Sequence, residues 1–251
     1  MQFSLKEVLG FSQEEEPDTK EEAMLDLIAI YNKEVNRNNL GRLFVDNDKD
    51  LVFPKLQKAI TLYLSSGFLT PDDIKESSEI MNFLISKAEE YLKKGKINKF
   101  NKLKDIWIQS HLMSKEEVNS LPKIQNAVIE NLIVQEMFDI PKKFPDFREK
   151  AVKTGVFTEN EINNHQRVRS VALQKISFFV KDGVKAFKED LKRWLDMGVK
   201  ITQDDMLIST NLKKAIIERL LLIESHGKTT VDSEKSEWQK LTGIDLSQVN
   251  I

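Results

Sequence analysis

The sequence predicts an all-α fold in the form of a right-handed-type α-solenoid, built from degenerate helical repeats of about 44 residues. Composition is the first indication. The 251 residues include 9 glycines and 6 prolines and are rich in Lys, Glu, Leu and Ile, which favours helix over strand or loop. The second indication is a short turn that recurs at a step of about 44 residues. One helix pair cannot bury its apolar face alone, so we expect stacked copies to share a continuous core.

The recurring turn joins the end of one helix to the start of the next. Its hydroxyl residues, each 44 residues from the next, are Thr70, Ser114, Thr158 and Thr202. An acidic residue follows three positions later and can reach back to the N–H of the hydroxyl cap, which is the capping-box arrangement. Gly67, Gly155 and Gly198 precede the turn, where a left-handed backbone closes the preceding helix. His111 replaces this glycine in one copy and predicts a poorer cap.

Each repeat is expected to contain three helices. The first has about 12 residues, begins near Phe100, Phe144 or Phe187, and ends at the recurring turn. A short helical turn follows the capping box, and a longer helix then carries apolar residues at spacings of three and four. The predicted longer helices are 79–94, 122–138, 166–182 and 210–226. They are predicted to end at a second recurring position, which is occupied by Gly95, Asp139, Gly183 and Gly227.

Weaker copies of the turn are predicted at both ends, over 10–15 and 243–247. A helix is expected from about 20 to 36, followed by an inserted loop over 37–50 that is rich in Asn, Asp and Gly. The predicted organisation is one elongated body rather than two domains. It comprises a degenerate N-terminal repeat or cap with the inserted loop (1–50), a helical-repeat array (51–227), and the start of a further repeat or a C-terminal cap (228–251).

The length and three-part layout of this unit resemble HEAT and armadillo repeats in architecture. Stretches such as 118–127 and 144–168 are similar to tandem helical repeats in uncharacterised proteins of candidate-phyla bacteria. That similarity covers most of residues 51–227 and implies no activity. A fainter resemblance is to mitochondrial-termination-factor-type repeats, which pair such a turn with a following proline and bind nucleic acid. Here only Pro122 supplies the proline, and the period is longer.

Charge and motif content limit the classes of function. Charged residues make up 31% of the chain but the net charge is −2, which favours a mixed, solubilising surface over strong attraction to polyanions or membranes. The absence of cysteine excludes disulfides, thiolate zinc sites and cysteine nucleophiles. No run approaches 18 apolar residues, so we expect a cytoplasmic protein. No phosphate-binding, nucleophile or metalloprotease motif occurs, so we predict a non-enzyme without cofactor or metal.

Two sets of conspicuous residues have a structural interpretation beside a functional one. Trp107, Trp194 and Trp238 share one position of the first helix and are predicted to lie in the core, with a ladder of binding anchors as the alternative. Glu161 and His165 have the i, i+4 spacing of some metal ligands. The other copies differ there, so we expect no metal site.

Basic residues of the first helices are the candidate partner-binding residues. They are Lys99, Lys102, Lys143, Arg148, Lys185, Lys188 and Lys192. In a regular stack they would form a strip that could follow a phosphate backbone, whereas cations near helix C-termini and a solvated face explain the same pattern. Acidic residues such as Asp146 and Glu189 interrupt the strip.

We therefore expect a non-enzymatic scaffold that binds a protein or peptide partner through an extended surface. One alternative is a nucleic-acid-binding helical array that uses the lysine-rich strip. The other is a helical accessory domain of a larger enzyme, which the arrest of the pattern in mid-unit at Ile251 suggests.

Overall fold

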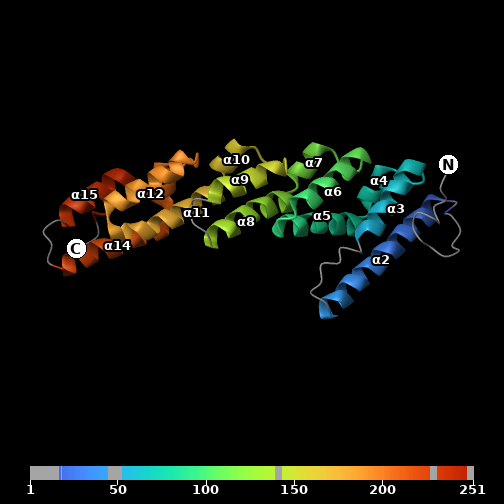
Figure 1. Ribbon diagram of the computed structural model, residues 1–251, viewed down its shortest axis with the longest axis horizontal. Helices are drawn as coiled ribbons and strands as arrows, with labels where there is room; N and C mark the ends of the chain where they lie inside the picture. Colours follow the sequence, from blue (N-terminus) through green and yellow to red (C-terminus); the bar gives the residue numbers. More distant parts are fainter. Residues whose placement is uncertain (1–16, 18, 45–52, 139–142, 227–230, 248–251) are drawn as a thin grey trace. The chain divides into compact units, whose positions relative to one another are not determined.

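The structure is a computed structural model that describes residues 17, 19–44, 53–138, 143–226 and 231–247 (Figure 1). Within these ranges the chain consists of helices joined by short turns, and no strand occurs. The all-α prediction is confirmed. Tertiary contacts divide the chain into two compact units, one of residues 1–92 and 96–124 and the other of residues 93–95 and 125–251.

The first unit is built from six helices in the ranges that the structure describes. They are α2 Lys20–Phe44, α3 Phe53–Ser66, α4 Pro71–Glu76, α5 Ser78–Lys93, α6 Ile97–Gln109 and α7 Lys115–Ser120. Helix α2 packs against α3 and α5. The Tyr63 hydroxyl donates a hydrogen bond to Asp26, and the rings of Tyr31 and Phe83 meet edge to face at 5.4 Å.

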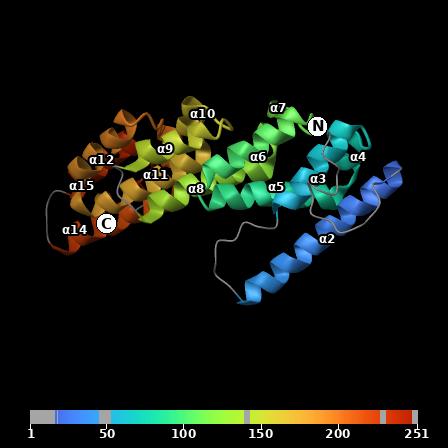
Figure 2. The same ribbon diagram turned by 45° about the vertical axis from the view of Figure 1, so that its right-hand side comes forward.

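The second unit contains the remaining described helices. They are α8 Pro122–Phe138, which starts in the first unit, α9 Phe144–Lys153, α10 Glu159–Asn164, α11 Gln166–Ser177, the 3-10 segment η2 Phe178–Asp182, α12 Val184–Asp196, α13 Gln203–Ile208, α14 Thr210–Ser225 and α15 Val231–Thr242. Figures 1 and 2 show two layers within this unit: α9, α12 and α15 lie on one side, and α8, α11 and α14 on the other.

All four predicted capping boxes are present, at the starts of α4, α7, α10 and α13. At Thr70, for example, the backbone N–H donates to the Asp73 carboxylate at 2.8 Å and the hydroxyl accepts from the Asp73 N–H at 3.3 Å. The preceding glycines have left-handed backbone, as at Gly155 (φ 66°). His111 takes the same conformation with φ 58°, which confirms its predicted place as a non-glycine cap.

Three of the four capping acids also pair with a cation from an earlier helix. Lys20 of α2 pairs with Asp73. Lys75 of α4 lies 3.3 Å from Glu117, and Arg169 of α11 lies 3.0 Å from Asp205. These carboxylates therefore start their own short helix and also tie it to another helix of the same unit.

The tryptophans lie in the core, as predicted, and each is at most 2% exposed. The ring of Phe144 in α9 meets Trp194 in α12 edge to face at 5.5 Å, and Phe187 in α12 meets Trp238 in α15 at 5.1 Å. Tyr63 lies 44 residues before Trp107 and is also buried. We call this shared location the aromatic position.

Two predicted boundaries are wrong. Residues 37–44 belong to α2 and not to a loop, because no proline interrupts them and the propensity penalties of Asn and Gly, at most about 1 kcal/mol each, are too small to end a helix. The predicted helix 166–182 changes to 3-10 geometry at Phe178, a common tightening in a last turn, here before Gly183 with φ 96°. The predictions for 10–15, 45–50, Asp139 and Gly227 concern residues outside the described ranges.

Candidate functional site

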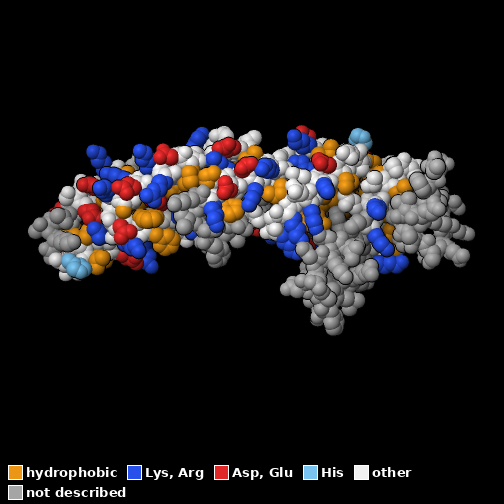
Figure 3. Space-filling view, in the orientation of Figure 1, with side chains coloured by type: hydrophobic (Ala, Val, Ile, Leu, Met, Phe, Trp, Pro, Cys, Tyr) orange, Lys and Arg blue, Asp and Glu red, His pale blue; other side chains and the backbone are white. Residues whose placement is uncertain are grey.

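Six of the seven candidate basic residues have exposed side chains. Lys99 and Lys102 lie on α6 of the first unit, whereas Lys143 precedes α9 and Lys185, Lys188 and Lys192 lie on α12 of the second unit. On the face of the second unit shown in Figure 3, basic and acidic side chains are interspersed, and Lys188 pairs with Glu237 at 3.9 Å. This mixture gives the second unit a weaker phosphate-binding surface than an uninterrupted basic strip would.

Arg148 differs from the other candidates because its guanidinium is held inside the second unit. It donates to the Asn163 side-chain oxygen at 2.9 Å and to the Met197 carbonyl, and it lies 2.9 Å from the Glu159 carboxylate. Its charge also lies over the Phe144 ring, 5.5 Å from the centroid. Through these contacts the Arg148 guanidinium joins α9, α10 and α12.

The same contact occurs 44 residues earlier in the first unit. Lys104 of α6 is buried and donates to the Asn119 side-chain oxygen at 2.6 Å. Burial, followed by the charge of Lys115, lowers the pKa of Lys104. Lys104 and Arg148 thus serve as internal ties at equivalent positions, although the basic pattern of the sequence groups both with the surface strip.

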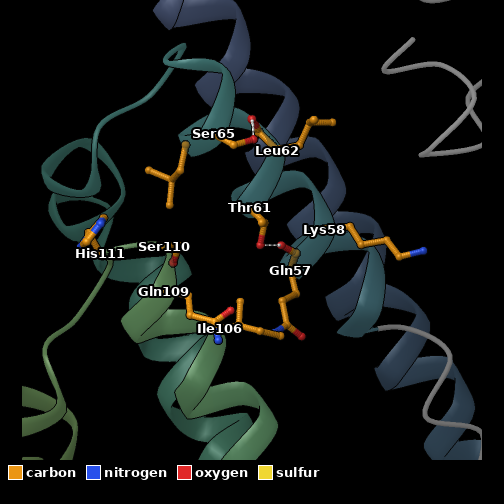
Figure 4. Close-up of a pocket in the computed structure, with 10 residues that line it drawn as sticks. Gln57, Lys58, Thr61, Leu62, Ser65, Ile106, Gln109, Ser110 and His111 are labelled. Atoms are coloured by element: carbon orange, nitrogen blue, oxygen red, sulfur yellow. Dashed lines mark hydrogen bonds between the residues drawn. The ribbon is translucent and has the colours of Figure 1, made fainter. Parts of the chain in front are cut away.

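An open groove in the first unit lies between α3 and the end of α6, with a volume of about 670 Å³ (Figure 4). Its lining comprises Gln57, Lys58, Thr61, Leu62, Leu64 and Ser65 from α3 and Ile106, Gln109, Ser110 and His111 from α6 and its cap. The volume falls in the range of roughly 300–1,000 Å³ that is typical of binding pockets. We take this α3–α6 groove as the candidate functional site.

Helical periodicity places a line of polar groups along the α3 side. Gln57, Thr61 and Ser65 follow one another at intervals of four residues and therefore share one face of α3. On the opposite wall, Ile106, Gln109 and Ser110 face the groove from the last turns of α6. Leu64 and Ile106 also line the groove and supply apolar surface.

The hydroxyl groups of the groove already use their protons within their own helices. Thr61 donates to the Gln57 carbonyl at 3.0 Å, Ser65 to the Leu62 carbonyl at 2.9 Å, and Ser110 to the Trp107 carbonyl at 3.3 Å. Their oxygens remain able to accept hydrogen bonds. The side-chain Nε2 of Gln57 is a buried donor without a hydrogen-bond partner in the described part of the chain. The groove therefore offers acceptors and, in Gln57, an unused buried donor.

The groove carries little charge. Only Lys58 and His111 are titratable among the ten lining residues, and none is acidic. Lys58 is exposed and points away from the cavity in Figure 4. The walls are therefore largely neutral, in a chain of which 31% of the residues are charged.

The corresponding helix pair of the second unit is bridged by an ion pair. Gln57 lies six residues before the aromatic position in α3, and Lys188 lies six residues before it in α12. Ile106 directly precedes Trp107, as Glu237 precedes Trp238. Lys188 and Glu237 pair across α12 and α15 at 3.9 Å, where the α3–α6 groove has a neutral amide and an aliphatic side chain.

The sequence pattern places Asp190 of α12 among the acidic residues that interrupt the basic surface strip, and this placement is wrong because the carboxylate is buried. Asp190 is 2% exposed, and its oxygens have no hydrogen bond among the described residues; the nearest cation is Arg193, at 3.6 Å. Burial raises the pKa of Asp190. The sequence contains a signal for this burial. Asp190 lies four residues before Trp194, and the corresponding position four residues before Trp107 is occupied by the apolar Leu103.

Glu161 and His165 are used in helix capping. Glu161 closes the capping box of α10, and the His165 ring nitrogen accepts from the Arg167 N–H at 3.3 Å at the start of α11. Burial, followed by the charges of Arg167 and Arg169, lowers the pKa of His165. In the described ranges no three His, Asp or Glu side chains lie close enough together to hold a metal ion.

The sequence matches no protein-family model, and comparison with curated proteins and with solved structures gives no match either. The described helices also include none that is long and apolar enough to span a bilayer.

Proposed function

We propose that the protein is a non-enzymatic helical-repeat scaffold of the α-solenoid type that binds a protein or peptide partner. The α3–α6 groove carries this proposal, because it combines a volume of about 670 Å³ with apolar surface and a few hydrogen-bonding groups. Such chemistry suits recognition of a neutral ligand surface. Stacked helical repeats commonly present extended surfaces to partners.

Contacts that recur at the repeat step support the solenoid part of the proposal. The Asn131 side chain of α8 donates to the Lys93 carbonyl at 3.1 Å. Arg219 of α14, 88 residues further on, donates to the Lys181 carbonyl at 3.0 Å, so donor and acceptor have moved by two steps of 44. The four capping boxes keep the same step. A quasi-one-dimensional array makes this kind of neighbour contact in successive copies.

Affinity capture followed by reconstitution tests the proposal. The full chain is immobilised and exposed to host lysate, and each retained protein is then purified and titrated against the chain by calorimetry. We expect at least one protein to form a stoichiometric complex. An empty capture experiment, or failure of every captured and purified protein to bind the chain, would contradict the proposed function.

The nucleic-acid alternative is tested in parallel with a variant that carries Lys99→Glu, Lys143→Glu and Lys188→Glu. Because phosphate contacts release counterions, nucleic-acid binding would fall steeply with rising salt and be lost in this variant. We expect gel shifts with RNA and DNA to show no such binding at low salt. A salt-dependent shift that the three substitutions abolish would favour the alternative.

A further inference from the structure

We propose that the α3–α6 groove binds a short, extended and uncharged peptide segment with an apolar side chain at alternate positions. This inference rests on the proposed function, since it names the site and the kind of partner segment. It depends on four features of the groove: the spacing of its polar groups, its hydrogen-bonding capacity, its charge, and its difference from the bridged pair in the second unit.

The spacing of polar groups along α3 matches an extended chain. Gln57, Thr61 and Ser65 are four residues apart, and a rise of about 1.5 Å per residue separates successive members by about 6 Å. An extended peptide advances about 6.6 Å for every two residues. Each polar group can therefore face every second residue of a bound segment, and the length from Gln57 to Ser65, about 12 Å, accommodates about four residues.

The hydrogen-bonding groups complement a peptide backbone. Thr61, Ser65 and Ser110 donate their protons to carbonyls of their own helices, so their oxygens can accept from peptide N–H groups. The Gln57 Nε2 donor has no partner among the described residues, and rotation of its terminal torsion would present it to a peptide carbonyl. Backbone amides supply both kinds of partner, because each residue other than proline carries one donor and one acceptor.

Charge determines which side chains the groove admits. Among the described residues that line the groove none is acidic, so a Lys or Arg side chain would be desolvated there without an ion-pair partner from these residues. Leu64 and Ile106 present aliphatic surface on opposite walls, which favours an apolar side chain between them. Side chains alternate in direction along an extended segment, so every second residue would point inward. We therefore expect the bound peptide segment to have a residue pattern such as apolar–small polar–apolar–small polar.

Comparison with the second unit shows how such a groove can be closed. Lys188 and Glu237 bridge α12 and α15 at positions that correspond to Gln57 and Ile106. Installing that ion pair between α3 and α6 would place two charged side chains in the path of the peptide and replace the free amide donor. Gln57→Lys and Ile106→Glu should therefore block the α3–α6 groove. Both residue types are copied from corresponding positions in α12 and α15, where the fold accommodates them.

A displayed library of random nine-residue peptides, panned against the immobilised full chain, tests the inference. Recovered peptides are labelled with fluorescein and titrated by anisotropy against wild type and against the double variant Gln57→Lys, Ile106→Glu. We expect a shared core of about four residues without Lys or Arg, and at least tenfold weaker binding to the variant. The matched control is Lys188→Gln with Glu237→Ile, which makes the reverse exchange in the second unit and should leave the affinity unchanged.

Two measurements guard against a trivial loss of structure. Far-UV circular dichroism and the thermal midpoint should be close to wild type in both double variants.

The milder variant Gln57→Leu removes only the amide. We expect it to weaken peptide binding about fivefold, which is in the usual range for the loss of one hydrogen bond. In ¹⁵N-labelled protein, the side-chain NH₂ signals of Gln57 should shift on addition of the peptide, whereas those of Gln203 should not.

The outcomes separate this inference from the broader function. Peptides that bind wild type and the Gln57→Lys, Ile106→Glu variant equally would overturn the groove assignment and leave peptide binding intact. An empty library beside a reconstituted partner complex would do the same. Enriched peptides with helical i, i+4 patterning would contradict the extended conformation, and dimerisation of the chain abolished by the variant would assign the groove to a second copy. Absence of both peptides and partner proteins would overturn both proposals.

Discussion

Replacing Arg148 with alanine should destabilise the second unit by about 2–4 kcal/mol. The guanidinium donates to the Asn163 side chain at 2.9 Å and to the Met197 carbonyl, and hydrogen bonds that involve a charged group contribute about 1.5 kcal/mol or more each. The pair with Glu159 adds little, because Glu159 is largely exposed. Truncation also leaves the buried Asn163 amide oxygen without its donor and removes the contact with the Phe144 ring.

Urea unfolding followed by circular dichroism and tryptophan fluorescence measures this loss. Trp194 and Trp238 lie in the second unit and report on its core. The matched control is Lys192→Ala on α12, whose exposed side chain should change the stability by less than about 0.5 kcal/mol. If Arg148→Ala lowers the free energy of unfolding by less than about 1 kcal/mol, the reasoning is refuted. The Arg148 guanidinium would then again be a candidate for binding a partner.

Three further predictions concern single positions. His111→Gly should raise the free energy of unfolding by about 1 kcal/mol, because φ 58° is unfavourable for a side chain; a lower thermal midpoint would contradict this. Asp190→Asn should stabilise the protein at pH 7 by about 1 kcal/mol, and the gain should shrink as the pH falls towards 4, because burial raises the pKa of Asp190 and so penalises its charged form above that pKa. Urea titrations at pH 7 and 4.5 should show this difference, and an equal gain at both would argue against a buried charge. The hydrogen bonds from Lys20 and Thr70 lower the pKa of Asp73 to about 2, so the stability that its carboxylate contributes is complete above about pH 4 and is lost as the pH falls to 2. Thermal midpoints should decline less over this interval in Asp73→Asn, and identical slopes would count against the pairing.

The capping boxes could be predicted because their signal is local. A hydroxyl residue, an acid three positions on and a preceding glycine determine the helix end and start through bonds within a few residues, as at Thr158 and Glu161. The burial of Trp194 followed from its recurrence at one position. In contrast, the extension of α2 to Phe44 and the 3-10 geometry at Phe178 arise from small energetic differences that single residue types do not determine.

The α3–α6 groove could not be predicted from the sequence, because it forms between residues more than 40 positions apart whose types are ordinary. Gln57 and Ile106 become informative only when they are aligned on the aromatic position with Lys188 and Glu237. The internal role of Arg148 is concealed for a related reason. Its contact with Asn163 spans 15 residues and repeats the contact of Lys104 with Asn119, so comparison of side-chain pairs between copies would reveal what a map of charge alone does not.

The repeated contacts divide the positions of this chain into two kinds. Some keep one structural task while the residue type changes, as when Asn131 and Arg219 each donate to a carbonyl that ends an earlier helix. Others change the surface while the fold stays the same, as when Gln57 stands where α12 carries Lys188. Substitution at the first kind should alter stability, whereas exchange at positions of the second kind that line the α3–α6 groove should alter binding. The α3–α6 groove lies at positions of the second kind, so reciprocal exchange of its residues with those of α12 and α15 separates recognition from folding within one chain.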